Sequence, residues 1–290
     1  MDVFLPTSLE EALGILADRP DAVPIAGGTD LMVALNFRRL RPAAMIDLTR
    51  LPELQEIHRD GGAMFLGAGV TYARILRELP EVRTLAEASR TVGSPQIRAR
   101  GTVGGNLGTG SPAGDALPVL AVHDAEVGLV AAGGRQRWVP WHEFLQGPKR
   151  TARRGDELIL GARWRPVDGP GSFSKIGTRN AMVIAVASLC LLLDPVARSV
   201  RVALGSVAPT VVRAPGAEAF AADALAAAGV WEDPAVGLDP EIVREFAELV
   251  VGAAAPIDDL RGSAAYRRHA VGVLARRALT WATTHGEVAA

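Results

Sequence analysis

Cysteine is nearly absent from the sequence, and its scarcity excludes two kinds of site. Cys190 is the only cysteine, so the chain cannot form a disulfide within itself. An iron–sulfur cluster held by this chain alone is also excluded, because such clusters use about four cysteine thiolates. Cys190 lies inside the apolar run 184–193, where we expect a buried and unreactive thiol.

The sequence also lacks an excess of either charge and any long apolar run. It contains 31 Lys and Arg residues against 32 Asp and Glu residues, for a net charge of -1. This balance gives no general reason to bind nucleic acid or an anionic membrane. No segment reaches the ~18 apolar residues of a membrane span, and residues 1–10 do not resemble a secretory signal. We therefore expect a cytoplasmic protein that binds small molecules and protein partners.

Lysine and histidine offer few candidates for chemistry. Only two of the 31 basic residues are lysines, Lys149 and Lys175. A codon bias toward arginine explains this, but a compact ammonium and a planar guanidinium do different chemistry, so each lysine is a candidate for a special role. We predict no metal site, because the five histidines are scattered without metal-ligand spacing: His58, His123, His142, His269 and His285. No His/Asp/Ser grouping stands out in residues 169–290 either, and we predict no catalytic acid or base.

The pattern of apolar residues predicts an α+β fold in two domains. In the first domain, 1–168, Ser8 precedes an amphipathic stretch typical of a capped helix, and the apolar runs 23–26 and 44–48 predict buried strands. We place its two subdomains at about 1–57 and 58–168.

The second domain, 169–290, begins at the Pro- and Gly-rich stretch 166–171, which is a natural boundary. Three strand-like runs are followed by three helical patterns. We therefore expect a small α+β domain with a three-stranded sheet covered by helices. The strands are predicted at 172–176, 183–193 and 200–207, and the helices at 216–228, 239–251 and 263–283.

Two glycine-rich loops are the main candidates for ligand binding. Gly27-Gly28-Thr29-Asp30 follows a predicted strand and precedes a helical pattern, so consecutive backbone N–H groups could hold a diphosphate. A single Gly-Gly pair is more often a tight turn. A second loop, Thr102 to Asn106, lies in a segment, 91–114, that contains seven glycines, and the two loops together favour a phosphate-bearing ligand.

Two other nucleotide-binding motifs are excluded by spacing. A P-loop needs a lysine directly after glycine, whereas Lys149 follows Pro148 and Lys175 follows Ser174. The segment 67–72 begins like a Rossmann fingerprint, but Tyr72 occupies its third small position.

Asp115 is placed to accept hydrogen bonds from ribityl or ribose hydroxyls, and it could equally cap the helix that begins there.

These motifs resemble the FAD loops of the flavin subunits of molybdenum hydroxylases, a family that includes xanthine and carbon monoxide dehydrogenases. The matching segments are 24–31 (PIAGGTDL), 101–115 (GTVGGNLGTGSPAGD) and 175–182 (KIGTRNAM). The resemblance covers essentially the whole chain. Within the family, 94–98 (SPQIR), 174–182 and 256–262 (PIDDLRG) look most like a bacterial xanthine dehydrogenase flavin subunit.

The resemblance implies a two-subdomain FAD-binding domain of the vanillyl-alcohol-oxidase or PCMH type, followed by a C-terminal domain of the carbon monoxide dehydrogenase flavoprotein type. The resemblance would place Val92 near the adenine end, where some relatives have an aromatic residue. Carried over position by position, the FAD-binding residues are Ile25, Ala26, Gly27, Gly28, Thr29, Asp30, Leu31, Thr102, Val103, Gly104, Gly105, Asn106, Thr109, Asp115, Ile159 and Lys175.

The function implied is electron transfer within a heterotrimeric complex. Electrons would leave the substrate at a molybdenum cofactor in a large subunit, pass through 2Fe-2S clusters in a small subunit, and reach FAD on this chain and then NAD. The positive charge of Lys175 would favour the reduced flavin, unless it is an ordinary surface lysine. Residues 177–184 would border the reactive edge of the flavin and influence NAD access, although 181–184 could instead begin a buried strand.

Three alternatives remain open at this stage. The chain could be a stand-alone flavin oxidase or reductase on the same fold, or a subunit of a carbon monoxide dehydrogenase type with another electron acceptor. It could also be a non-catalytic assembly module whose glycines serve turns only. In that case a basic side of the last helix would be a docking surface or simply a solvated face, formed by Arg261, Arg267, Arg268, Arg276 and Arg277.

Overall fold

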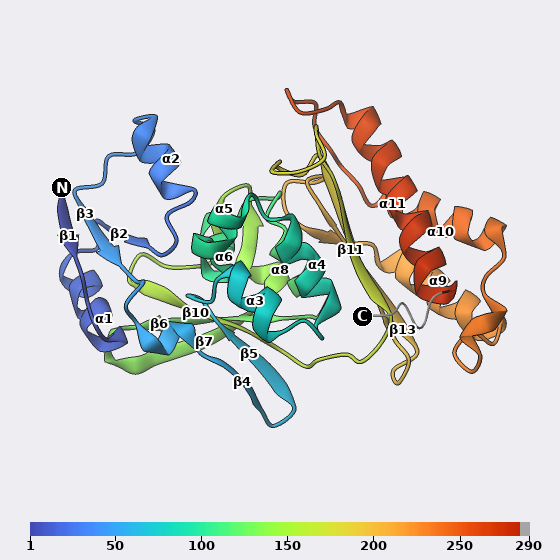
Figure 1. Ribbon diagram of the computed structural model, residues 1–290, viewed down its shortest axis with the longest axis horizontal. Coiled ribbons are helices and arrows are strands. Elements are labelled where there is room, and N and C mark those ends of the chain that lie inside the picture. The colour runs from blue at the N-terminus through green and yellow to red at the C-terminus, as the bar shows by residue number, and fades with distance from the viewer. Residues whose placement is uncertain (285–290) are drawn as a thin grey trace. The chain divides into compact units, whose positions relative to one another are not determined.

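The computed structural model describes residues 1–284, which separate into two compact units (Figure 1). The first unit consists of 1–79, 92–111 and 124–165, and the second of 80–91, 112–123 and the chain from 166 onward. Two short segments from the first half of the sequence therefore fold with the second unit. The contiguous boundary expected between 168 and 169 stays a prediction.

The N-terminal part of the first unit is built on a three-stranded parallel sheet with the order β1-β3-β2. Its elements are β1 (Asp2–Phe4), α1 (Leu9–Asp18), β2 (Ala22–Ile25), α2 (Leu31–Asn36) and β3 (Ala44–Asp47). Ser8 caps α1 by accepting a hydrogen bond from Glu11 N, as predicted. Helix α1 buries Leu13 and Leu16, whereas α2 buries no residue.

The rest of the first unit surrounds a five-stranded antiparallel sheet with the order β4-β5-β10-β6-β7. Alternate residues such as Leu66 and Leu129 are fully buried on one face. On the other face, the Arg163 guanidinium lies 4.0 Å from the Trp138 ring centroid. The strands of this sheet are β4 (Ile57–Asp60), β5 (Ala63–Gly67), β6 (Glu126–Ala131), β7 (Arg135–Pro140) and β10 (Glu157–Trp164). Strands β8 (Leu145–Gly147) and β9 (Arg150–Thr151) form a separate two-stranded sheet. The helices are η1 (Pro52–Gln55), α3 (Tyr72–Glu78), α5 (Pro95–Arg100), α6 (Val103–Thr109), η2 (Ala132–Gly134) and α8 (Trp141–Phe144).

The second unit is an antiparallel sheet with helices against both faces. Its strands are β11 (Gly171–Ile176), β12 (Ala187–Asp194), β13 (Ser199–Gly205) and β14 (Val212–Arg213), in that order across the sheet. Its helices are α4 (Arg83–Thr91), α7 (Ala116–Val122), α9 (Pro215–Ala227), η3 (Pro234–Val236), α10 (Pro240–Gly252) and α11 (Ala264–Thr284). The predicted three-stranded sheet lacks β14, because a two-residue strand gives no periodic signal.

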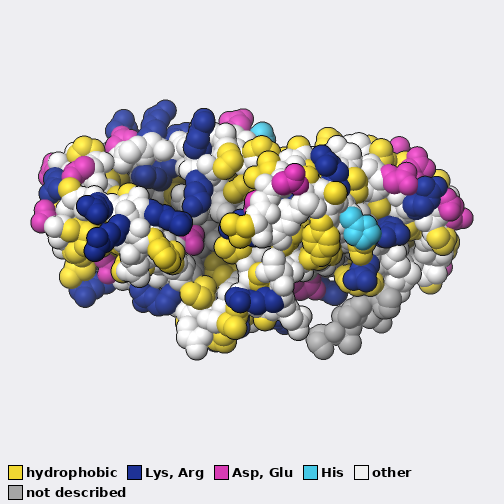
Figure 2. All heavy atoms as spheres, turned by 90° about the horizontal axis from the view of Figure 1, so that it is seen from above, with side chains coloured by type: hydrophobic (Ala, Val, Ile, Leu, Met, Phe, Trp, Pro, Cys, Tyr) yellow, Lys and Arg dark blue, Asp and Glu magenta, His cyan; other side chains and the backbone are white. Residues whose placement is uncertain are grey.

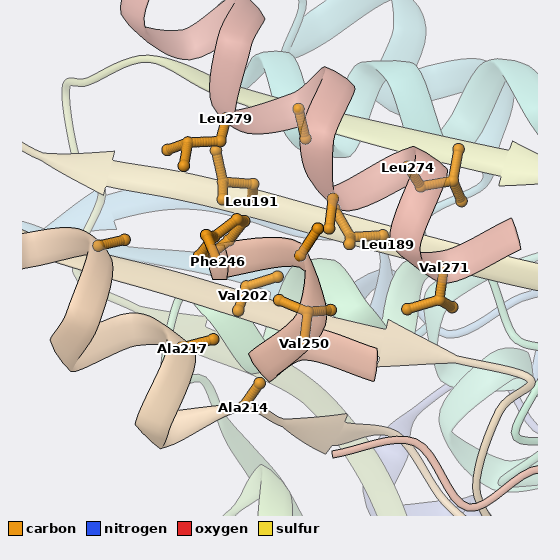
Figure 3. Packing of buried hydrophobic residues seen from close by; sticks show 14 of the residues in the cluster. Leu189, Leu191, Val202, Ala214, Ala217, Phe246, Val250, Val271, Leu274 and Leu279 are labelled. Atoms are coloured by element: carbon orange, nitrogen blue, oxygen red, sulfur yellow. The ribbon is translucent and has the colours of Figure 1, made fainter. Parts of the chain in front are cut away.

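The core of the second unit lies between the sheet and helices α9, α10 and α11 (Figure 3). Leu189 and Leu191 of β12 face Phe246 of α10 and Leu279 of α11, and all four are fully buried. Each such side chain contributes about 1.5–3 kcal/mol through its removal from water. Cys190 points to the opposite face and is fully buried, as predicted, and this burial raises the pKa of its thiol well above the ordinary value.

Strand β12 begins four residues later than the sequence pattern indicates. The predicted strand starts at Val183, but Met182 has a φ of 51° and the ladder begins at Ala187. Met182 and Ile184 are more than half exposed, so the interpretation of 181–184 as the start of a buried strand is wrong. Among residues 1–284, no helix is long and apolar enough to cross a membrane.

Candidate functional site

The first glycine loop offers unused backbone donors. It joins the end of β2 to the start of α2, and Gly28 adopts a φ of 75°, which favours glycine. Within the described chain, the N–H groups of Gly27, Gly28, Thr29 and Asp30 have no hydrogen-bond acceptor. Four successive unpaired donors at a strand end form a site suited to an anion.

The second glycine loop has a different role, because four of its five N–H groups, those of residues 103–106, are already used. Thr102 caps α6 by accepting a hydrogen bond from Gly105 N at 2.9 Å. Val103 N donates to Val70 O, Gly104 N to Ala68 O, and Asn106 N to Thr102 O. This loop can therefore offer a ligand mainly its surface, whereas the run of four successive free donors belongs to the first loop.

The two glycines of the second loop differ in what surrounds them. A Cβ built at Gly104 would lie 2.5 Å from Ala68 Cβ and 2.6 Å from Ala68 O, so packing alone requires glycine there. Gly105 is exposed, and a Cβ on it would have only Thr102 Oγ1 nearby, at 3.2 Å. No contact within the described chain explains why Gly105 carries no side chain.

The structure brings the two loops together, although they are far apart in the sequence. A Cβ at Gly27 would lie 1.8 Å from Arg100 O and 3.0 Å from Gly101 N, which means that the backbones touch there. Thr109 Oγ1 donates to Asp30 Oδ2 at 2.9 Å and links the end of α6 to the first loop. The contact with Arg100 has no sequence signal, since it is made by a backbone carbonyl.

Ile159 lies in the same unit as the loops and is buried in β10. Its Cδ1 atom is 3.7 Å from the position of a Cβ at Gly108, so it packs beneath α6. The predicted residues Ile25 to Leu31, Thr102 to Asn106, Thr109 and Ile159 all belong to the first unit.

Asp115 and Lys175 belong to the second unit, where they form a buried ion pair. Lys175 Nζ lies 2.5 Å from Asp115 Oδ2, and the two side chains are 7% and 6% exposed. Thr91 completes the cluster: its carbonyl accepts from Lys175 Nζ at 2.9 Å, and its hydroxyl donates to Asp115 Oδ2 at 3.1 Å. The sequence analysis missed Thr91, because no local pattern relates it to residues 24 and 84 positions away.

The geometry of this cluster tests the alternative roles considered for Lys175 and Asp115. Lys175 is not a surface lysine, and Asp115 stands before α7 without making a side-chain capping bond. Burial raises the pKa of the Asp115 carboxyl, and the attraction and hydrogen bonds of Lys175 and Thr91 oppose that rise. Asp115 Oδ1 is buried without a hydrogen-bond partner in the described chain, a state that costs about 1–3 kcal/mol unless a ligand supplies the partner.

The segment 177–184 forms a bend whose carbonyl groups are held by Arg179. The guanidinium donates to Ala181 O at 3.1 Å and to Met182 O at 2.5 Å. No group of three His, Cys, Asp or Glu side chains suited to a metal occurs among residues 1–284, and His285 lies outside the described residues.

Two family models match the chain. Residues 1–163 match the FAD binding domain in molybdopterin dehydrogenase. Residues 172–282 match the CO dehydrogenase flavoprotein C-terminal domain. The free donors of the first loop are a feature that a polar cofactor such as FAD would use.

Individual relatives align over nearly the full chain. The carbon monoxide dehydrogenase medium chain of Hydrogenophaga pseudoflava is 30% identical over 96% of this chain and 96% of its own length. The putative xanthine dehydrogenase FAD-binding subunit XdhB of Escherichia coli K12 is 28% identical over 94% of this chain and 92% of its own. The crystal structure of quinoline 2-oxidoreductase from Pseudomonas putida 86 superposes with a TM-score of 0.86 at 25% identity, covering 99% of this chain and 98% of that one.

Proposed function

Since the chain belongs to the family of FAD-binding domains in molybdopterin dehydrogenases, as the FAD subunit of a molybdenum hydroxylase, we propose that its complex is a xanthine dehydrogenase that reduces NAD. The molybdenum cofactor and 2Fe-2S clusters would lie on large and small partner subunits. The family fixes the FAD, while the likeness to XdhB over 94% of the chain supports the choice of xanthine.

The observation that carries FAD binding is the row of unpaired N–H groups in the first loop. We propose that the N–H groups of Gly27 to Asp30 hold the diphosphate and that the bare surface of Gly105 lets it approach the second loop. In the second unit, Asp115 Oδ1 and the N–H of Lys175 that the cluster leaves unused would bind polar atoms of FAD. Bound FAD would supply two-electron chemistry, taking electrons from a partner and passing them to NAD.

A second candidate is a carbon monoxide dehydrogenase type of complex with another acceptor. It is favoured by the 30% identity to the Hydrogenophaga medium chain over 96% of this chain. The two candidates share the flavin site and differ in the substrate, which a partner subunit would bind, and in the acceptor.

We expect the purified complex to contain iron, molybdenum and FAD and to form NADH when given xanthine. Each of xanthine and carbon monoxide is supplied with NAD or with an artificial dye, and the absorbance of NADH or dye is followed. NADH from xanthine supports the proposal, whereas dye reduction by carbon monoxide alone would replace it with the second candidate. Metal-free protein that reduces its own flavin with a substrate would identify a stand-alone enzyme.

Substitutions at the two glycines of the second loop can distinguish a role in ligand binding from a role in folding. Gly105→Ala is expected to leave the unfolding transition unchanged or slightly raised, because alanine favours a helix, and to weaken FAD binding by about tenfold, or ~1.4 kcal/mol. Gly104→Ala, its neighbour, should instead destabilise the fold through its clash with Ala68. Flavin titration and thermal unfolding of both variants measure this, and full FAD affinity in Gly105→Ala would remove the second loop from the proposed site.

A further inference from the structure

Residues 31–42, named the basic arm here, lack the buried face that a surface helix normally has. The arm consists of α2 and the six residues that follow it, and no residue of α2 is buried. Four of its large apolar side chains are exposed, Phe37 most of all at 69%, whereas Leu31 and Leu35 are half-buried. A short helix is stabilised mainly by packing an apolar face against its neighbours, so this segment presents an apolar surface that the described chain leaves uncovered. The exposed apolar residues are Met32, Val33, Phe37 and Leu40.

The same arm carries concentrated positive charge. Arg38, Arg39 and Arg41 are exposed, and none pairs with a carboxylate in the described part of the chain. No acidic residue occurs in residues 31–46, although the whole chain has a net charge of only -1. In Figure 2, Lys and Arg side chains gather with apolar ones between them on the left of the face shown. A partner for this surface must therefore combine acidic groups with an apolar patch.

The arm is continuous with the first glycine loop. Asp30, the last loop residue before α2, is bound by Thr109. A Cβ at Gly28 would lie 3.3 Å from Met32 Cγ, so the first turn of α2 packs directly on the loop. Arg100, whose carbonyl touches Gly27, is exposed and also without an ion pair in residues 1–284. A protein that covers the arm would thus sit beside the residues proposed to hold FAD.

The last helix, considered from the sequence as an alternative docking surface, has ordinary surface-helix packing. Helix α11 buries one whole side, including Leu274 and Leu279, and its exposed arginines lie on the other side. Arg267 does not belong to that basic side, because it is 4% exposed and donates to Val186 O, Ser206 O and Asp259. The expected basic side is therefore wrong at Arg267, which instead fixes the start of α11 to the sheet.

We propose that the basic arm is the docking surface for the partner subunit that delivers electrons to FAD, and that this partner presents carboxylates around an apolar patch. The inference rests on the proposed function, which requires such a partner. Phe, Met and Arg are enriched in protein interfaces relative to the rest of the protein surface. Phe37 forms the apolar anchor, and the three arginines steer and orient the partner.

The test uses the complex purified from its own cells and measures iron per flavin. Arg38→Glu/Arg39→Glu/Arg41→Glu is expected to lower the iron-to-flavin ratio at least about tenfold after gel filtration, because acidic groups now face acidic groups. Phe37→Ser should lower the ratio as well, with less dependence on salt. The matched control is Arg268→Glu/Arg276→Glu/Arg277→Glu, which reverses three exposed arginines of α11 and should retain the wild-type ratio. Flavin absorbance per chain shows whether the cofactor site survives in each variant.

The outcomes separate this inference from the proposed function. Wild-type protein that purifies without iron would overturn both. Wild-type complex with iron, together with an arm variant that keeps the same ratio at low and high salt, would overturn the docking inference alone. Loss of iron in the control variant would move the interface to α11. If the arm instead mediates binding to vesicles of phosphatidylcholine and phosphatidylserine, and its reversal abolishes only that binding, the surface recognises lipid and the proposal is wrong.

Discussion

Replacing Gly27 by alanine is expected to remove most of the bound FAD and to destabilise the first unit. The added Cβ would lie 1.8 Å from Arg100 O and 2.5 Å from Arg100 C, and both are backbone atoms that cannot rotate away. The two glycine loops must therefore separate. Overpacking of this kind costs about 1–3 kcal/mol or more, and separated loops should bind FAD at least about tenfold more weakly, a loss of ~1.4 kcal/mol.

The matched control is Gly14→Ala in α1, where an added Cβ has no neighbour within 4 Å. Alanine in a helix interior stabilises by up to about 1 kcal/mol relative to glycine, so this variant should keep its flavin and unfold at a slightly higher temperature. Flavin absorbance per chain and thermal unfolding compare the two. Wild-type flavin content in Gly27→Ala would show that contact between the loops is unnecessary for binding.

The glycine loops were predictable because their signal is local. A strand, a Gly-Gly pair and a helical pattern follow one another within a few residues, and the structure places Gly27 and Gly28 between β2 and α2 as expected. The sequence could not show which N–H groups stay free. That depends in part on Val70 and Ala68, whose carbonyls accept hydrogen bonds from the second loop, whereas no carbonyl accepts one from Gly27 to Asp30 in the described chain.

The second unit was harder to predict because its contacts span long stretches of sequence. Helices α4 and α7 pack against strands that come later in the chain, and no periodicity within a helix reports which sheet it will cover. The late start of β12 has a similar cause. The run 183–193 is continuously apolar, but the bend at Met182 and the bonds from Arg179 keep its first residues out of the ladder.

Replacing Lys175 by alanine is expected to cause the largest loss of stability in the second unit. The substitution leaves the Asp115 carboxylate buried without its counter-ion, since the two side chains are only 6–7% exposed. Removing one partner of a buried ion pair typically costs about 3–5 kcal/mol. Denaturant unfolding, monitored separately for the two units, measures the change.

The stability lost in Lys175→Ala should depend on pH in a definite direction. Burial already raises the pKa of Asp115 in the folded protein, and loss of the Lys175 charge raises it further. The folded variant then binds a proton more readily than the unfolded chain, in which the pKa of an aspartate is ~3.9. The free energy of unfolding of the variant, relative to the wild type, therefore falls as the pH rises from the unfolded-state pKa to the raised folded-state pKa of Asp115. The loss of stability is greatest above the folded-state pKa.

The double variant Lys175→Met/Asp115→Asn separates the ion pair from the cofactor. It contains no buried charge at this position, so most of the lost stability should return and the pH dependence from this site should vanish. FAD binding should be weakened and the flavin midpoint potential altered, because the Asp115 carboxylate and the Lys175 ammonium are both absent. A stable double variant with wild-type FAD affinity and potential would restrict Lys175 and Asp115 to folding, and Lys175→Ala with unchanged stability would contradict the buried pair itself.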